Sequence, residues 1–179
     1  MTEELEAEEA SYYQSLIGVL RWMVELGRVD ICTEVSMMSS HLAMPSHGHL
    51  EALFHLFAYL KAHQNSEMVF DPSEPAIDMA DFPREDWSLS IYGDVEEELP
   101  PQKPFEESGP GDMPEPRGRG FRMRVYVDCD LGGELVTRRS RTGFAVFLNN
   151  APIYWLSKKQ RSYEVSTFGS EFTAMKQAV

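Results

Sequence analysis

The sequence lacks the features that mark several common protein classes. No apolar run approaches the roughly 18 residues that a membrane-spanning helix needs, and no charged-then-apolar signal segment opens the chain. The two cysteines, Cys32 and Cys129, stand far apart and fit a reduced intracellular protein better than a disulfide scaffold. No glycine-rich phosphate loop and no serine nucleophile elbow is present. We therefore expect no membrane insertion, no secretion, and neither nucleotide hydrolysis nor acyl transfer.

Charges of the two signs are unevenly shared along the 179 residues, whose formal net charge is −13. Residues 71–116 hold fourteen acids, two bases and nine of the eleven prolines. Residues 117–179 hold eleven bases and five acids, a formal +6. The first segment is typical of a linker or a disordered insert. The second segment is compatible with a polyanionic partner, although the net charge of the whole chain is negative.

Hydrophobic spacing divides the rest of the chain into a helical part and a sheet-forming part. Apolar residues recur with helical spacing in three segments, 11–26, 30–45 and 47–63, and Asp30 and Ser46 are candidate N-caps of the last two. They alternate with period two in 121–128, which predicts a strand. Two further strands are predicted at 142–150 and 152–159, and a helix capped by Ser166 or Thr167 follows.

This spacing predicts an α+β protein in three parts. A unit of three helices occupies 1–70, and an acidic, proline-rich linker occupies 71–116. The part at 117–179 contains an incomplete sheet of three antiparallel strands with one helix packed across it.

Two acids interrupt the apolar alternation in "VYVDCDLGG". Asp128 and Asp130 lie on one face of the extended chain, and Glu171 lies about one turn into the final helix, which could bring it to the end of the first strand. Clustered carboxylates attract a hard cation such as magnesium, because each alone repels the others. The alternative is that Asp128 and Asp130 only end a strand at a solvated turn. Spacing alone leaves both interpretations open.

Basic side chains flank the second and third predicted strands. They are Arg138, Arg139, Arg141, Lys158, Lys159 and Arg161. Neutralisation of nucleic-acid phosphates is their functional interpretation, and a solvated surface is the alternative. All five histidines lie between His41 and His63, and no familiar metal-ligand spacing joins them, so we interpret them as residues of helix surfaces.

Several motifs of the chain resemble those of one family. "YQSLIGVLRWMVELGRVDI" and "MPSHGHLEALFHLFAYLK" resemble the stretch that follows the polymerase core in copia-type retrotransposon Pol polyproteins. "YVDCDLGG", "RRSRTGFAVFL", "IYWLSKKQ" and "STFGSEFTA" resemble successive motifs of that family's ribonuclease H, in the same order. By this resemblance, 1–70 is a thumb- or connection-like region of the polymerase and 117–179 is the N-terminal half of the ribonuclease H.

The resemblance implies an enzyme that hydrolyses the RNA strand of RNA–DNA hybrids with two magnesium ions. It makes Asp128 the first metal-binding acid and Glu171 the second, with Asp130 at an accessory position. The nucleic-acid-binding residues would be Arg138, Arg139, Ser140, Lys158 and Lys159. The implied partners are an RNA–DNA hybrid or another nucleic-acid duplex and the rest of the Pol polyprotein, with no membrane involved. The implied location is the cytoplasm, within a virus-like particle, or the nucleus.

The chain also departs from the family's motifs. Val29 stands in place of a proline, Leu131 in place of a tryptophan, and Gly169 in place of a glutamate. The family carries its next metal-binding aspartate on a fourth strand, and these 179 residues do not reach that strand. We therefore expect the 179-residue chain to be inactive alone. The alternative function, a non-catalytic domesticated or decayed remnant that binds nucleic acid or protein, stays open.

Overall fold

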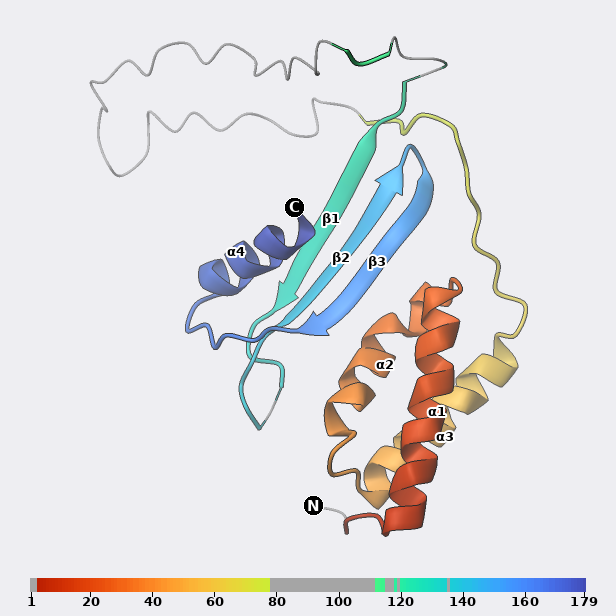
Figure 1. Ribbon diagram of the computed structural model, residues 1–179, viewed down its shortest axis with the longest axis vertical. Coiled ribbons are helices and arrows are strands. Elements are labelled where there is room, and N and C mark those ends of the chain that lie inside the picture. The colour runs from red at the N-terminus through yellow and green to blue at the C-terminus, as the bar shows by residue number, and fades with distance from the viewer. Residues whose placement is uncertain (1–2, 78–111, 115–117, 119, 135) are drawn as a thin grey trace. The chain divides into compact units, whose positions relative to one another are not determined.

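The computed structural model describes residues 3–77, 112–114, 118, 120–134 and 136–179. Residues 1–74 and 122–179 form one compact unit, and 75–121 form a second. Within the described residues, the first unit contains four α-helices and a three-stranded antiparallel sheet, which confirms the predicted α+β class (Figure 1). Most of the predicted linker at 71–116 lies outside the described residues. None of the described helices has the length and apolar character needed to cross a membrane.

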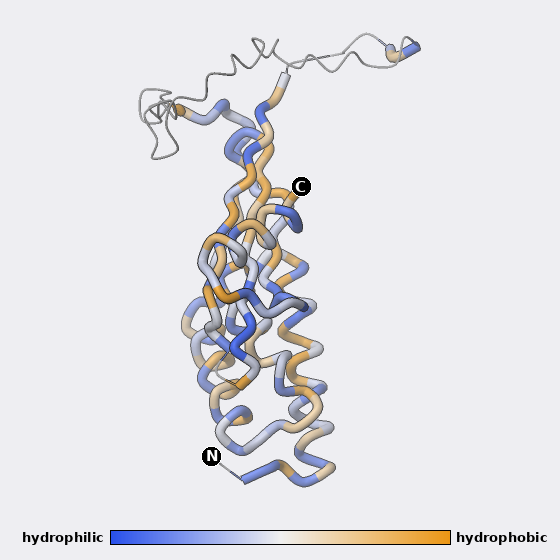
Figure 2. Tube along the Cα trace, turned by 90° about the vertical axis from the view of Figure 1, so that its left-hand side faces the viewer, coloured by the Kyte–Doolittle hydropathy of each residue, from blue (hydrophilic) through white to orange (hydrophobic). Residues whose placement is uncertain are grey.

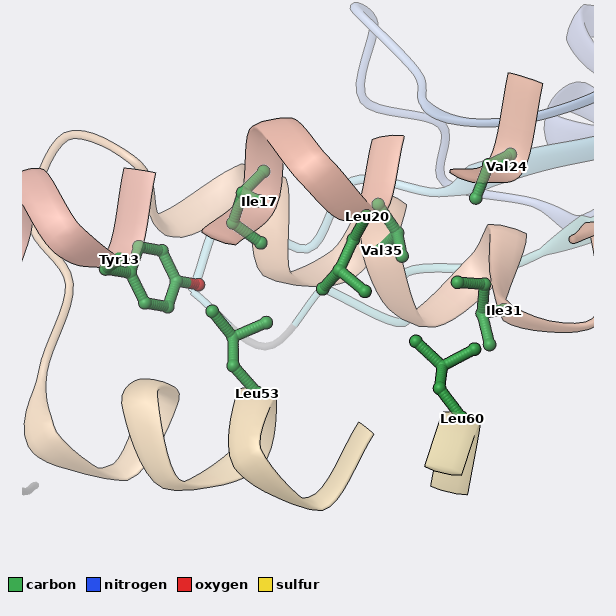
Figure 3. Close-up of a cluster of buried hydrophobic side chains, with 8 residues drawn as sticks. All are labelled: Tyr13, Ile17, Leu20, Val24, Ile31, Val35, Leu53 and Leu60. Atoms are coloured by element: carbon green, nitrogen blue, oxygen red, sulfur yellow. The ribbon is translucent and has the colours of Figure 1, made fainter. Parts of the chain in front are cut away.

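The N-terminal part of this unit is helical. Its elements are α1 (Ala7–Glu25), the short 3-10 turn η1 (Val29–Ile31), α2 (Cys32–Met38), a second 3-10 turn η2 (Ser39–His41) and α3 (His47–Ala62). Their shared core consists of eight buried side chains that gather between the three α-helices in Figure 3: Tyr13, Ile17, Leu20, Val24, Ile31, Val35, Leu53 and Leu60. The Tyr13 hydroxyl donates to the Met38 carbonyl at 2.8 Å, and burial raises the pKa of Tyr13 to about 12.

The helix predicted at 30–45 is shorter than expected, so that prediction was wrong in its extent. α2 ends at Met38, and η2 follows it directly. The Ser39 hydroxyl donates to the Val35 carbonyl at 2.7 Å, and the Ser40 hydroxyl donates to the Ser36 carbonyl at 3.3 Å. Such back-bonding competes with the regular helical ladder, and it occurs where α2 tightens into η2.

The predicted helix caps have different outcomes. Ser46 immediately precedes α3, and Ser166 precedes the C-terminal helix, where its hydroxyl accepts from the Gly169 N–H at 3.1 Å. Asp30 does not cap α2 but lies inside η1, where it forms an ion pair with Arg28 at 2.7 Å. The hydrogen bond from Arg28 holds the pKa of the Asp30 carboxyl below its usual range. Asp30 therefore forms an ion pair and does not cap a helix.

The sheet contains β1 (Met123–Asp130), β2 (Arg141–Leu148) and β3 (Ala151–Lys159) in that order, so β2 is the central strand. α4 (Thr167–Ala178) packs against β1 and β2 through its buried residues Ser170 and Ala174 (Figure 1). Hydrophobic and hydrophilic positions are interspersed along the helices in Figure 2, as expected for elements that each bury one face.

The turn between β2 and β3 contacts two stretches of the chain: the one that leads into the second unit and the one that returns from it. Asn149 adopts a left-handed conformation (φ 53°), which asparagine tolerates better than most residues. Its Nδ2 donates to the Pro72 carbonyl at 2.9 Å, and its Oδ1 accepts from the Arg122 N–H at 2.8 Å. Asn150 Nδ2 donates to the Ser73 hydroxyl at 3.0 Å. This one turn therefore holds the residues at 72–73 and at 122 close together.

Polar contacts also join the sheet to the helices. Trp155 of β3 packs against the helical core, and its indole Nε1 donates to the Val24 carbonyl at 3.1 Å. The Arg141 guanidinium donates to the hydroxyl of Ser36 on α2. Because these contacts connect residues far apart in sequence, the helices and the sheet belong to one folded unit.

Candidate functional site

Side chains alternate between the two faces of β1, and this alternation separates the two aspartates from α4. Cys129 faces α4, because Gln160 Nε2 contacts both its Sγ, at 3.3 Å, and the Ser170 carbonyl of α4, at 2.9 Å. Asp128 and Asp130 therefore lie on the opposite face, where both are exposed. The structure thus brings the two aspartates together on one face.

Asp128 and Asp130 line a cleft of about 500 Å³ between the sheet and the helices of the same unit. The sheet side adds Glu134 from the loop after β1, and the helical side adds His41 and His49. Three carboxylates, two imidazoles and the Arg141 guanidinium therefore share one open cleft. This cleft is the candidate site on this face of the sheet.

The loop after β1 shapes the edge of the cleft and depends on two glycines. Gly132 adopts φ 62°, which most residues avoid, and its N–H donates to the Ser140 Oγ at 3.1 Å. A side chain at Gly133 would overlap the Asp130 carboxylate. Ser140, one of the residues predicted to bind nucleic acid, is 0% exposed and supports this loop from inside.

Glu171, the second predicted metal ligand, lies on α4 and is half-buried. It does not line the cleft that contains Asp128. Burial raises the pKa of Cys129, and the negative charges of Glu171 and Asp128 raise it further. Cys129 directly follows Asp128, and Gln160 Nε2 contacts both its Sγ and the carbonyl of Ser170, the residue before Glu171.

The donor types of these acids fit magnesium. Carboxylate oxygens are ligands that Mg²⁺ prefers, and no ion pair is described for Asp128 or Glu171 in the part of the chain that the structure covers. Across that same part, no three His, Cys, Asp or Glu side chains are grouped so that they could hold a metal ion. Asp128 and Glu171 therefore supply part of a ligand set rather than a complete one.

His41 and His49 belong to the cleft, although their sequence pattern indicated only helix surfaces. Their rings stack with centroids 3.9 Å apart and planes 18° apart. His49 Nδ1 also accepts from the Ser46 N–H at 3.1 Å, which ties the ring to the start of α3. Burial, and then the neighbouring His49, lowers the pKa of His41. The sequence predicted a helix that contains His49, but nothing in the sequence placed this residue beside a strand.

The predicted nucleic-acid-binding residues do not all share one face. Arg138 and Arg139 are exposed in the loop before β2. Lys158 is exposed and pairs in register with Thr142 on the α4 face, whereas the half-buried Lys159 pairs with Arg141 on the cleft face. Exposed positive charge is therefore distributed around the end of the sheet rather than collected in a single patch.

No protein-family model and no solved structure matches the chain. Secreted RxLR effector protein 161 of Plasmopara viticola is 22% identical over 93% of this chain and 85% of its own length. The retrovirus-related Pol polyproteins from transposon TNT 1-94 of Nicotiana tabacum and from transposon RE1 of Arabidopsis thaliana are each 22% identical, over 90% and 91% of this chain. The chain spans only 9% and 8% of the length of those polyproteins. It is thus similar, over most of its own length, to a short segment of retrotransposon Pol polyproteins.

Proposed function

We propose that the chain corresponds to the junction of reverse transcriptase and ribonuclease H in a copia-type Pol polyprotein. The complete form would hydrolyse the RNA strand of RNA–DNA hybrids. The observation that carries this proposal is the position of Asp128 in the first of three antiparallel strands that are followed by a helix bearing Glu171. This order agrees with the order of the ribonuclease H motifs in the sequence. The similarity to two Pol polyproteins supports the same origin.

Asp128 and Glu171 would hold magnesium in the complete domain, with Asp130 as an accessory ligand. Two bound ions would activate a water molecule and stabilise the leaving oxygen of a phosphodiester. The chain presents the exposed carboxylates of Asp128 and Asp130 on the face of β1 away from α4 and the half-buried carboxylate of Glu171 on α4, and Glu171 does not line the same cleft as the two aspartates.

The nucleic-acid partner would be an RNA–DNA hybrid or a similar duplex, bound through phosphates by Arg138, Arg139, Lys158 and Lys159, next to the loop that Ser140 supports. Such contacts are indifferent to sequence and weaken steeply with salt. The rest of the Pol polyprotein is the second proposed partner, and the proposed place of action is a cytoplasmic virus-like particle or the nucleus.

A hybrid-cleavage assay in magnesium tests the proposed activity. The 179-residue chain should cleave poorly, because it supplies only part of the ligand set. A version extended by the family's following strand, which carries a further aspartate, should cleave, and Asp128→Asn or Glu171→Gln should abolish that cleavage. If the extended version is folded and inactive, or if its activity survives both substitutions, the proposed catalytic site is wrong.

A second candidate is a non-catalytic module that binds nucleic acid or protein. The similarity to the effector protein favours this second candidate, because the matched segment makes up 85% of that protein. The two candidates differ in one assay. A binding module would retain salt-sensitive binding to the hybrid in Asp128→Asn, and its extended version would remain unable to cleave.

A further inference from the structure

A polar cluster lies between the sheet and α4. The buried polar side chains of the described residues are Ser140, Thr142, Gln160 and Ser170, each 0% or 1% exposed. All four belong to the sheet part of the molecule, at one end of the sheet and on the first turn of α4. Buried polar groups are retained at an energetic disadvantage unless their hydrogen bonds are satisfied, so this cluster calls for an explanation.

Gln160 is the centre of the cluster. It directly follows β3, and its backbone N–H donates to the Ser140 carbonyl at 2.8 Å. Its side-chain Nε2 lies 3.1 Å from Thr142 Oγ1, 3.3 Å from Cys129 Sγ and 2.9 Å from the Ser170 carbonyl. A single amide group therefore contacts β1, β2 and α4.

The partners of Gln160 are sequence neighbours of the two predicted metal ligands. Cys129 directly follows Asp128 on β1, and Ser170 directly precedes Glu171 on α4. Because consecutive Cα atoms are about 3.8 Å apart, holding each neighbour also holds the backbone from which the adjoining acid extends. The amide thus links the two residues that directly adjoin the acids.

Stability alone does not account for this amide. Gln160 Oε1 is buried and has no hydrogen-bond partner among the described residues. Leaving such a group unsatisfied costs about 1–3 kcal/mol, which offsets part of what the contacts of Nε2 contribute to stability. The amide does supply direction, because a hydrogen bond weakens steeply away from its preferred geometry while apolar packing does not.

We propose that Gln160 is a positioning residue that fixes the separation of Asp128 and Glu171 by holding Cys129 and Ser170 through one amide. The role of the two acids as ligands rests on the proposed function, but the positioning of α4 on the sheet does not. The two can therefore be tested separately.

Distances between spin labels test the positioning directly. Labels at Tyr126→Cys on β1 and Lys176→Cys on α4, both exposed sites, would be introduced into the full chain with Cys32→Ala, leaving the buried Cys129 in place. Gln160→Met should broaden or shift the distance distribution, because it removes the amide and keeps the volume. The matched control is Gln177→Met, the same substitution at an exposed glutamine of α4. An unchanged distance distribution in folded Gln160→Met would overturn the proposal. If Gln160→Met does not fold, Gln160→Asn, whose side chain is one methylene shorter, takes its place in the same measurement.

Binding of Mn²⁺ to the unlabelled full chain tests what the positioning achieves. Gln160→Met should lower the affinity about tenfold, as expected when a group that orients metal ligands is lost. Adding Glu171→Gln to Gln160→Met should lower it little further. A purely structural role would change the melting temperature but not this affinity, and that result would also refute the proposal. If Asp128→Asn and Glu171→Gln leave Mn²⁺ binding unchanged, the proposed metal function fails, and the spin-label distances alone decide the role of Gln160.

Discussion

The helical part and the sheet part of the same unit bury opposite kinds of side chain. Eight apolar residues form the core between α1, α2 and α3, and its one polar atom, the Tyr13 hydroxyl, is hydrogen-bonded. Between the sheet and α4, the buried residues in the described part of the chain are Ser140, Thr142, Gln160 and Ser170, together with the apolar Cys129 and Ala174. One part is held mainly by the hydrophobic effect, and the other depends on hydrogen bonds.

The difference indicates a division of labour. Burial of an apolar side chain contributes about 1.5–3 kcal/mol without strict geometry, whereas a typical hydrogen bond contributes about 1 kcal/mol but requires a defined direction. The helical part should therefore supply most of the stability. The sheet part should supply the precise placement of the acids on β1 and α4.

The largest expected effect is in the helical core. Leu20→Ala should destabilise the protein by about 2–5 kcal/mol, because Leu20 is 0% exposed and the substitution leaves a cavity. Leu26→Ala, at a position 66% exposed, is the matched control and should change stability little. Urea unfolding followed by circular dichroism measures both. Similar losses for the two variants would contradict the picture of a dry helical core.

A smaller loss is expected in the polar cluster. Thr142→Val keeps the side-chain shape but removes the oxygen that accepts from Gln160 Nε2 at 3.1 Å, and should cost about 1–3 kcal/mol. Thr33→Val, at an exposed threonine, is the control. The same urea titration compares them. A stabilising effect of Thr142→Val would mean that the cluster behaves as an apolar core.

A still smaller loss of stability is expected where the helical part contacts the sheet part, and the same contact tests whether these two parts unfold together. Trp155→Phe keeps an aromatic ring but removes the N–H that donates to the Val24 carbonyl, and should cost about 0.5–1.5 kcal/mol. The loss is modest because that carbonyl also accepts from the Gly27 N–H at 3.1 Å. Trp22→Phe, at a position 64% exposed, is the control. Tryptophan fluorescence and circular dichroism should report one transition for the wild type, and separate transitions would show that the parts are independent.

The smallest expected effect concerns pH. Burial lowers the pKa of His41, so the unfolded chain takes up a proton at higher pH than the folded protein does. The unfolded state then binds more protons between the two pKa values, and the free energy of unfolding should decrease as pH falls below about 6.5, the ordinary histidine value. His41→Gln should flatten this part of the stability profile, measured by urea unfolding at several pH values. An unchanged slope in that variant would assign the dependence to another group.

Sequence periodicity was sufficient to predict the fold class and the strands. The alternation in 121–128 and the helical spacing in 11–26 reflect faces that each element must bury, and such faces are local properties of the sequence. The early end of α2 was missed because serine back-bonding competes with a helix that apolar spacing alone would continue. The local sequence pattern therefore predicted which elements form more accurately than it predicted where they end.

The candidate site was only partly predictable. Asp128 and Asp130 stand out because they interrupt an apolar strand. His41 reaches the same cleft only through packing of the helices against the sheet, which no local pattern encodes. The role of Gln160 depends on acceptors from three elements, so its contacts could be recognised only once those elements were assembled.

The turn at Asn149 has a consequence for how the sequence of this protein can change. Because one side chain binds both Pro72 and Arg122, the chain leaves the helix–sheet unit and returns to it at almost the same point. When the two ends of a connection are held together, each doubling of its length costs only about 0.6 kcal/mol in loop-closure entropy. The stretch between these two anchors can therefore be lengthened, shortened or exchanged over evolutionary time with little effect on the rest of the unit, and the same place is the natural point at which to insert a foreign domain.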